Sequence, residues 1–492
     1  MPHDSFTINY SNINYIYCQQ RGVFHMNEQK KKMELLGSAP VPKALLAMGL
    51  PTMIGMLINA LYNLADTYFV GGLGTDQMGA VTVAFPLGQV IVGLGLLFGN
   101  GAAAYLSRLL GCGDKETAGK VASTALYSSI LVGALVIVCS IIFLKPILRQ
   151  IGAMESVMPY ATVYASIYIT FSIFNIFNVA MNNIVSSEGA AKTAMSALAA
   201  GAVLNVILDP IFIYTLHLGV AGAAIATAIS QVVSTLVYFA YILQKKSVFS
   251  FRMKECCFSK SIMSEILKIG IPTLLFQLLT SLSISMINDA AKEFGGSALA
   301  AMGPVTKILS MGTLIVFGFL KGFQPIAGFS YGAKKFDRLQ EAIRTSILWS
   351  TLFCLIFGLA AVVFSQQIIS LFTKGDLEMI KIGATALRAN GLSFILFGFY
   401  TVYSFLFLVM GKAKEGCILG ALRQGICFVP VILIIPTYWG LHGILYAQPI
   451  ADVLAAVITV FMAVHLHKEL AAAKANTLHK EQALRCTMPH IK

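Results

Sequence analysis

Two carboxylates, Asp66 and Asp209, stand near the carboxyl ends of two long apolar segments of this 492-residue sequence, 44–70 and 192–214. A charge inside a membrane-spanning helix costs about 2.5–3.5 kcal/mol on insertion scales, so such residues are functional candidates. Two carboxylates that share a site of low dielectric constant hold a proton or a cation in preference to double ionisation. We therefore expect this pair to bind a proton or a small cation.

Three other polar residues fall at a depth comparable to that of the two acids. Asn205 lies one helical turn before Asp209, while Tyr164 and Thr227 lie near the starts of segments 159–185 and 219–243. At 1.5 Å per residue, these groups lie within roughly 8–14 Å of one membrane surface. Asn59, two turns before Asp66, would extend the network inward.

The second half of the chain carries a different set of polar candidates. These candidates are Gln277, Asp289, Lys307, Gln324, Arg388 and Asp452. Asp452 falls in the middle of an apolar segment, where we expect it to pair with a basic residue such as Lys307 or Arg388. For Arg423, extension of the side chain to the lipid headgroups is about as good an interpretation as an ion pair.

The elements that position these groups are predicted to be transmembrane helices. The chain is 57% hydrophobic and 12% charged, with a mean hydropathy of +0.77. Segments of about 20 apolar residues are long enough to cross a bilayer, and they are too long and too evenly apolar for barrel strands. We predict helices at 44–70, 79–105, 120–144, 159–185, 192–214, 219–243, 264–292, 298–329, 341–365, 379–410, 415–438 and 441–466.

Six glycines recur after an interval of 221 residues, which indicates an internal duplication. The pairs are Gly49 and Gly270, Gly74 and Gly295, Gly101 and Gly322, Gly111 and Gly332, Gly219 and Gly440, and Gly222 and Gly443. Duplicated apolar bundles are typical of secondary transporters. The predicted fold class is an all-α polytopic membrane protein with two six-helix bundles. Because six is even, their pseudo-twofold axis should run along the membrane normal.

The net charge of +13 reports topology, since most of the 35 Lys and Arg residues fall on one side of the predicted membrane. This is the positive-inside pattern, and it predicts that both termini are cytoplasmic. The expected location of the protein is the inner membrane of the cell. We expect no nucleic-acid partner.

The predicted domains follow from the two bundles. We expect a disordered cytoplasmic segment at 1–42, an amino-terminal lobe at 43–243, a basic linker at 244–263, a carboxy-terminal lobe at 264–467 and a cytoplasmic tail at 468–492. Translation could start at Met1 or Met26. Nucleotide-binding and hydrolase motifs are absent from the sequence, and most of the eight His lie in the tails, so we do not expect an enzyme.

Aromatic residues are frequent on three of the predicted helices. They are Phe171, Phe174, Phe177, Phe276, Phe394, Phe397, Tyr400 and Tyr403. A cavity with such a lining would suit bulky, flat, apolar cations.

Several motifs resemble the multidrug and toxic compound extrusion (MATE) transporters across about residues 40–467. They are Gly49-Leu50-Pro51, Asn63-Leu64-Ala65-Asp66-Thr67, Leu204-Asn205-Val206-Ile207-Leu208-Asp209-Pro210 and Gly322-Phe323-Gln324-Pro325. The resemblance implies a two-lobed antiporter that exports drugs against inward Na⁺ or H⁺. It implies ion binding at Asp66, Asp209, Asn205, Tyr164 and Thr227, with Na⁺ possible at the two acids, and helix bending at Pro51.

The sequence is thus expected to encode a monomeric secondary exporter of cationic or amphipathic organic compounds, which needs a coupling ion and no other cofactor. A flippase or exporter of lipid-linked saccharides or other metabolites remains the alternative. The choice between H⁺ and Na⁺ stays open.

Overall fold

The regular elements of the structure, a computed structural model that describes residues 27–151, 153–372 and 376–487, are all helices. The predicted all-α fold is therefore confirmed. The amino-terminal half contains α2 (Val41–Gly71), α3 (Thr75–Cys112), α4 (Lys115–Ile142), α5 (Leu144–Ile151), α6 (Met158–Thr170), α7 (Ser172–Ser187), α8 (Ala191–Pro210), η1 (Ile211–Thr215) and α9 (Gly219–Leu243). The carboxy-terminal half contains η2 (Met253–Glu255), α10 (Lys260–Lys292), α11 (Gly296–Gly332), α12 (Phe336–Val363), α13 (Ser365–Ser370), α14 (Leu377–Val409), α15 (Ala413–Ala421), η3 (Leu422–Ile426), α16 (Phe428–Trp439) and α17 (Leu441–Thr487).

Among the described residues, 11 helices are long and apolar enough to cross a membrane, and a bent pair makes up to 12. The bent pair is α6 and α7, which meet at an angle of 48° where we predicted one helix over 159–185. Phe171 separates them with φ −91° and ψ 1°, outside helical geometry. No proline lies at this break, so the hydrophobic pattern could not indicate it.

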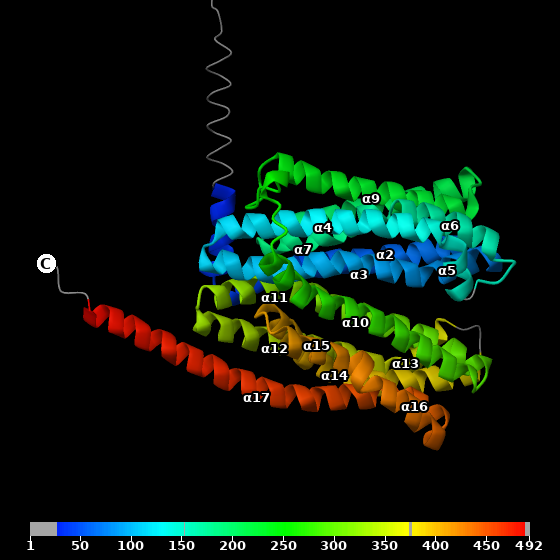
Figure 1. Cartoon of the computed structure of the whole chain (residues 1–492). Coiled ribbons are helices and arrows are strands. Elements are labelled where there is room, and N and C mark those ends of the chain that lie inside the picture. Colours follow the sequence, from blue (N-terminus) through cyan, green and yellow to red (C-terminus); the bar gives the residue numbers. More distant parts are fainter. Residues whose placement is uncertain (1–26, 152, 373–375, 488–492) are drawn as a thin grey trace, which may run out of the picture.

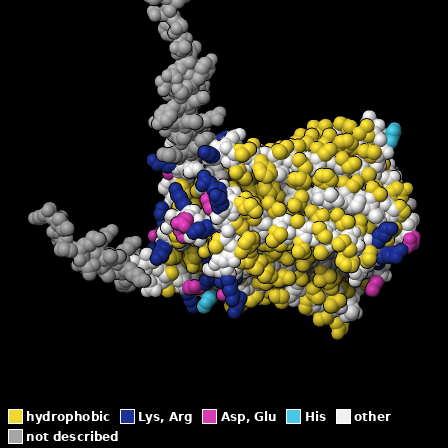
Figure 2. Space-filling view, turned by 45° about the horizontal axis from the view of Figure 1, so that its top comes forward, with side chains coloured by type: hydrophobic (Ala, Val, Ile, Leu, Met, Phe, Trp, Pro, Cys, Tyr) yellow, Lys and Arg dark blue, Asp and Glu magenta, His cyan; other side chains and the backbone are white. Residues whose placement is uncertain are grey.

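The helices form two lobes that lie side by side (Figure 1). We call α2–α9 the amino-terminal lobe and α10–α17 the carboxy-terminal lobe. Helix α17 continues past the predicted end at 466 as far as Thr487. Figure 2 shows Lys and Arg side chains concentrated at one end of the bundle, and we call this the basic end.

Four of the repeated glycines fix turns that other residues rarely adopt. Gly74 and Gly295 have φ values of 107° and 101°, and Gly219 and Gly440 have values of 55° and 54°. Positive φ is accessible to glycine without a steric penalty. The two halves therefore share the same backbone conformation at equivalent turns.

Three of the other repeated glycine pairs lie where the backbones of the two lobes touch. Gly49 faces Gly322, Gly101 faces the segment of Gly270, and Gly111 and Gly332 face the backbone of the opposite lobe. A Cβ at Gly111 would lie 2.2 Å from the carbonyl oxygen of Phe329, and one at Gly332 would lie 2.1 Å from that of Arg108. Small residues permit this close approach of helices in lipid. The glycines that recur in both halves thus include those at which the two lobes pack against each other.

Replacement of Gly322 by Ala is expected to destabilise the joint between the lobes. A Cβ there would lie 2.4 Å from the backbone nitrogen of Gly49, so helices α2 and α11 would have to separate. We expect the melting temperature in detergent to fall by about 1–3 °C, given that overpacking costs about 1–3 kcal/mol and that the unfolding entropy of a chain of this length is about 1 kcal/mol/K. The control is Gly303→Ala on the same helix, where nothing lies within 4 Å of the added Cβ. Equal melting temperatures for the two variants would contradict the tight joint.

Residues 27–37 form a helix at the basic end. Hydrogen bonds join the end of this helix to the carboxy-terminal lobe. The guanidinium of Arg338 donates to the carbonyl oxygens of Leu35, Leu36 and Ala39. Lys335 donates to the carbonyl of Gly37 at 2.8 Å. The expectation of disorder over 1–42 is therefore wrong for residues 27–42, while residues 1–26 lie outside the described part of the chain.

The same short helix also binds the amino-terminal lobe, through Lys32. The Lys32 ammonium donates to the Tyr241 hydroxyl and the Lys246 carbonyl, both at 2.6 Å. Tyr241 and Ser247 in turn donate to Glu188. Burial raises the pKa of the Glu188 carboxyl, and the nearby Lys32 opposes that shift. Residues 27–37 therefore contact both lobes at the basic end.

Candidate functional site

A cavity of about 640 Å³ lies between the lobes and is lined by both of them. Its amino-terminal wall includes Asp66 from α2 and Tyr164 from α6, while its carboxy-terminal wall includes Lys321 from α11. A volume of this size falls in the range of small-molecule binding sites.

The predicted amino-terminal cluster is largely assembled in the structure. The amide nitrogen of Asn205 lies 3.3 Å from Asp209 Oδ1 and 3.3 Å from Thr227 Oγ1. Asp209 is completely buried and Asn205 is 1% exposed. Asp66 lies on α2, which packs against α8, and it lines the same cavity as Thr227. Helices α2, α8 and α9 therefore converge on one polar site.

Three buried oxygen atoms of this cluster have no hydrogen-bond donor within the described part of the chain. They are Asp66 Oδ1, Asn205 Oδ1 and Asp209 Oδ2. Buried acceptors without a partner are costly and rare in native proteins. Carboxylate and amide oxygens are also the ligand types that hard cations bind. A bound proton or Na⁺ would satisfy these oxygen atoms.

The helix that carries Asp209 changes geometry directly after it. Pro210 ends α8, and the next turn, η1, is a π-helix. Proline has no N–H to donate to the preceding turn, and π-helical turns are frequent at functional sites. The wider turn therefore follows from the sequence at the point where the buried carboxylate must be held.

Tyr164 and Asn59 occupy the predicted region without a direct hydrogen bond to the acids. Tyr164 is 7% exposed and stacks on Tyr168 at a centroid distance of 6.0 Å. Asn59 accepts from Asn63 at 3.2 Å and lines the cavity. Pro51 lies inside α2 and is buried, next to Thr52, whose hydroxyl reaches the carbonyl of Gly318 across the joint at 2.6 Å.

Sequence reasoning missed two tyrosines of this site. Tyr62 and Tyr168 both line the cavity. Tyr62 lies one helical turn before Asp66, and Tyr168 lies one turn after Tyr164, so each shares a helix face with a predicted residue. Helical spacing around the predicted residues was the signal that could have identified them.

The carboxy-terminal candidates do not form a second cation site. Asp289 is exposed and pairs with Lys292 at 2.8 Å, while Lys307 and Arg388 are also exposed. Gln324 donates to Asn100 at 3.0 Å and Gln277 donates to Gln89. Both of these glutamines therefore join the lobes.

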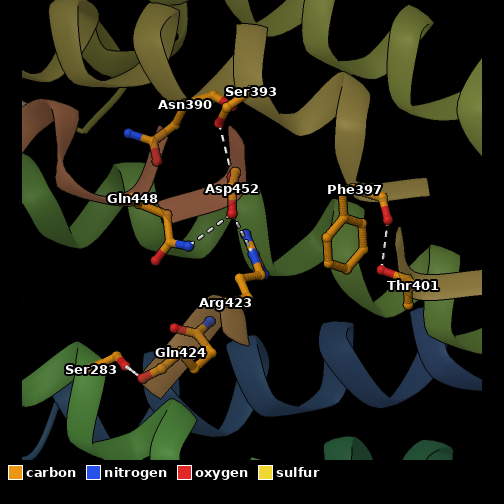
Figure 3. A network of polar contacts seen from close by, with 9 residues as sticks. All are labelled: Ser283, Asn390, Ser393, Phe397, Thr401, Arg423, Gln424, Gln448 and Asp452. Carbon is orange, nitrogen blue, oxygen red and sulfur yellow. Dashed lines mark hydrogen bonds and ion pairs between the residues drawn. The ribbon is translucent and has the colours of Figure 1, made fainter. Parts of the chain in front are cut away.

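Asp452 has a different partner from the one expected. Arg423 Nε lies 2.9 Å from Asp452 Oδ1, and both side chains are buried, with 9% and 2% exposed. Gln448 and Ser393 also donate to Asp452, each at 2.9 Å. Figure 3 shows these three donors converging on the carboxylate. The expectation that Asp452 pairs with Lys307 or Arg388 is wrong, and of the two interpretations of Arg423 the ion pair holds.

The reason for this pairing is the π-helical turn η3, which contains Arg423. A π-turn rotates the side chain away from the position that a regular helix would give it. Here the turn directs Arg423 into the lobe, where its guanidinium lies 4.7 Å from the centroid of Phe397.

Three of the eight predicted aromatic residues line the cavity, all from the carboxy-terminal lobe. They are Phe276, Phe397 and Tyr400. Phe317 and Phe405 join them, with centroids 5.8 Å apart. The other five predicted aromatics do not line it.

Comparison with known proteins agrees with this architecture. A family model described as MatE matches residues 51–211 and 270–434, one segment in each lobe. The chain is 30% identical over 434 residues to multidrug export protein MepA of Staphylococcus aureus (strain MRSA252), with 86% of this chain and 94% of that protein covered.

Solved structures of similar proteins have the same fold. A MATE in the bent conformation superposes with a TM-score of 0.85 at 29% identity, covering 90% of this chain and 99% of that one. The outward-facing conformation of a multidrug resistance MATE family transporter gives a TM-score of 0.83 at 29% identity, with the same coverage.

Proposed function

The chain belongs to the MATE family of transporters, and from this premise we propose that it exports multiple drugs by secondary active antiport. In this proposal, organic compounds occupy the cavity between the lobes and leave the cell in exchange for inward H⁺ or Na⁺. The S. aureus relative is a multidrug export protein, which supports the substrate class.

The observation that carries the proposal is the set of buried oxygens on Asp66, Asn205 and Asp209 that lack donors. Two ionised carboxylates at this site would repel each other in a poorly solvated environment. Uptake of one cation would satisfy the oxygens and remove the repulsion. Asp66 and Asp209 supply the charge in this scheme, and Asn205 and Thr227 position them.

Exchange follows from the place of Asp66 in the cavity wall. A basic group of a bound drug and a coupling cation would both be attracted to the same carboxylate. Arrival of the cation would therefore weaken the hold on the drug and favour its release. Competition of two ligands for one charged group is sufficient for antiport when the cavity between the lobes opens alternately to the two sides of the membrane.

We place the basic end in the cytoplasm. Figure 2 shows the Lys and Arg side chains gathered at that end, and cytoplasmic loops carry an excess of these residues. The two ends of the described part of the chain, near residues 27 and 487, would then lie on the cytoplasmic side.

Transport by purified protein in liposomes tests the proposal. A fluorescent organic cation is loaded, and its movement is followed under a Na⁺ gradient alone and under a pH gradient alone. We expect one of the two gradients to drive movement against the concentration gradient of the dye. Protein-dependent movement that neither gradient accelerates would rule out antiport with these ions.

A further inference from the structure

Lys321 places a positive charge in the carboxy-terminal wall of the cavity, at a point where no acid neutralises it. Its ammonium donates to Asn182 Oδ1 of the opposite lobe at 3.3 Å. Among the described residues, Lys321 takes part in none of the ion pairs. An ammonium has three N–H donors, so a single amide leaves donors available to a ligand.

The charges on the two cavity walls are opposite in sign. Asp66 is the only carboxylate of the described residues that lines the cavity, and it belongs to the amino-terminal lobe. Arg423 and Lys321 are the lining cations, and both belong to the carboxy-terminal lobe. Arg423 is neutralised by Asp452 at 2.9 Å. The uncompensated positive charge of the cavity is therefore that of Lys321.

An aromatic surface extends from Lys321 along the same wall. Phe317 lies one helical turn before Lys321 on α11, and its ring centroid lies 5.8 Å from that of Phe276 and 5.9 Å from that of Phe397. Flat rings stack well on such surfaces. The wall thus offers an apolar platform with a cation at its edge.

A hydroxyl on this wall also lacks an acceptor. Tyr400 is 4% exposed, lines the cavity and packs edge-on against Phe397 at 5.4 Å. Its oxygen has no hydrogen-bond partner in the described part of the chain. A buried O–H without an acceptor is complemented by a ligand that brings oxygen acceptors.

We propose that the carboxy-terminal wall is a carboxylate subsite, so that the preferred substrates are aromatic compounds with a carboxylate. The inference rests on the proposed export function and specifies its substrates. Lys321 binds the carboxylate, the aromatic body stacks on the Phe317 platform, and a basic group of a zwitterionic substrate faces Asp66. This differs from the apolar cations that the aromatic residues alone predicted.

The test compares two dyes that differ only at the carboxylate: a rhodamine with a free benzoate and its methyl ester. Dissociation constants are measured by fluorescence polarisation with the full chain in detergent. A hydrogen-bonded charge contributes about 1.5–3 kcal/mol, so Lys321→Gln should weaken binding of the free acid by about tenfold or more. Binding of the ester should change by less than about twofold, and Lys321→Arg should retain most of the affinity for the acid. Lys307→Gln removes an exposed lysine of the same helix and should change neither dye.

The outcomes separate this inference from the function on which it rests. Equal losses for both dyes in Lys321→Gln would mean that Lys321 only joins the lobes through Asn182, and would overturn the subsite. Unchanged binding of the acid would overturn it as well. In both cases the wild-type protein still binds dye, so the proposed export function is retained. If the wild type binds neither dye, the drug-binding cavity and the subsite are rejected together.

Discussion

Replacement of Asp209 by Asn is expected to abolish ion-driven export while the protein stays folded. The amide has nearly the shape of the carboxylate but cannot take up a proton or supply negative charge. Loss of one charged ligand costs about 1.5–3 kcal/mol, so the affinity of the site for its coupling cation should fall about ten- to a hundredfold. The rate of gradient-driven dye transport in liposomes should fall at least tenfold.

Stability distinguishes this result from misfolding. Asp209 is completely buried and no ion pair compensates it among the described residues, so a neutral amide removes a desolvation cost. We expect the melting temperature to stay constant or rise. Because Asp209 does not line the large cavity, dye binding should change by less than about threefold. The matched control is Asp289→Asn, which removes an exposed acid at the end of α10. Full ion-driven export by Asp209→Asn would show that coupling lies elsewhere.

The fold was largely predictable because its signals are strong and local. Apolar segments long enough to span a bilayer have few alternatives in lipid, and the 221-residue interval indicated two equivalent lobes. The structure explains why those particular glycines recur: Gly74 and Gly219 hold positive φ turns, and Gly49 and Gly322 touch across the joint. Breaks such as that at Phe171 depend on packing between helices, which no local pattern reports.

The amino-terminal site was more predictable than the carboxy-terminal one. Asn205 and Asp209 lie one turn apart on one helix, and depth along neighbouring helices placed Thr227 beside them. The partner of Asp452 depended instead on the π-turn that redirects Arg423. Regular helical spacing cannot anticipate such a turn, so the pairing had to be seen in three dimensions.

Removal of Asp452 is expected to have the largest effect on stability. Asp452→Ala leaves Arg423 buried without its counter-charge, and Gln448 and Ser393 lose their common acceptor. Removing one partner of a buried ion pair costs about 3–5 kcal/mol. The melting temperature in detergent should therefore fall by about 3–5 °C.

A double variant separates the cost of the orphaned charge from the value of the pair itself. In Arg423→Met with Asp452→Leu, no charge remains to be desolvated, and apolar side chains of similar size can pack against Phe397. Replacing a buried ion pair in this way is often neutral or stabilising, so most of the lost stability should return. Asp337→Ala breaks the exposed pair with Lys474 and should change stability by less than about 1 kcal/mol. If the double variant is as unstable as Asp452→Ala, the loss comes from the hydrogen bonds of Gln448 and Ser393 or from packing, and the orphaned arginine is not its cause.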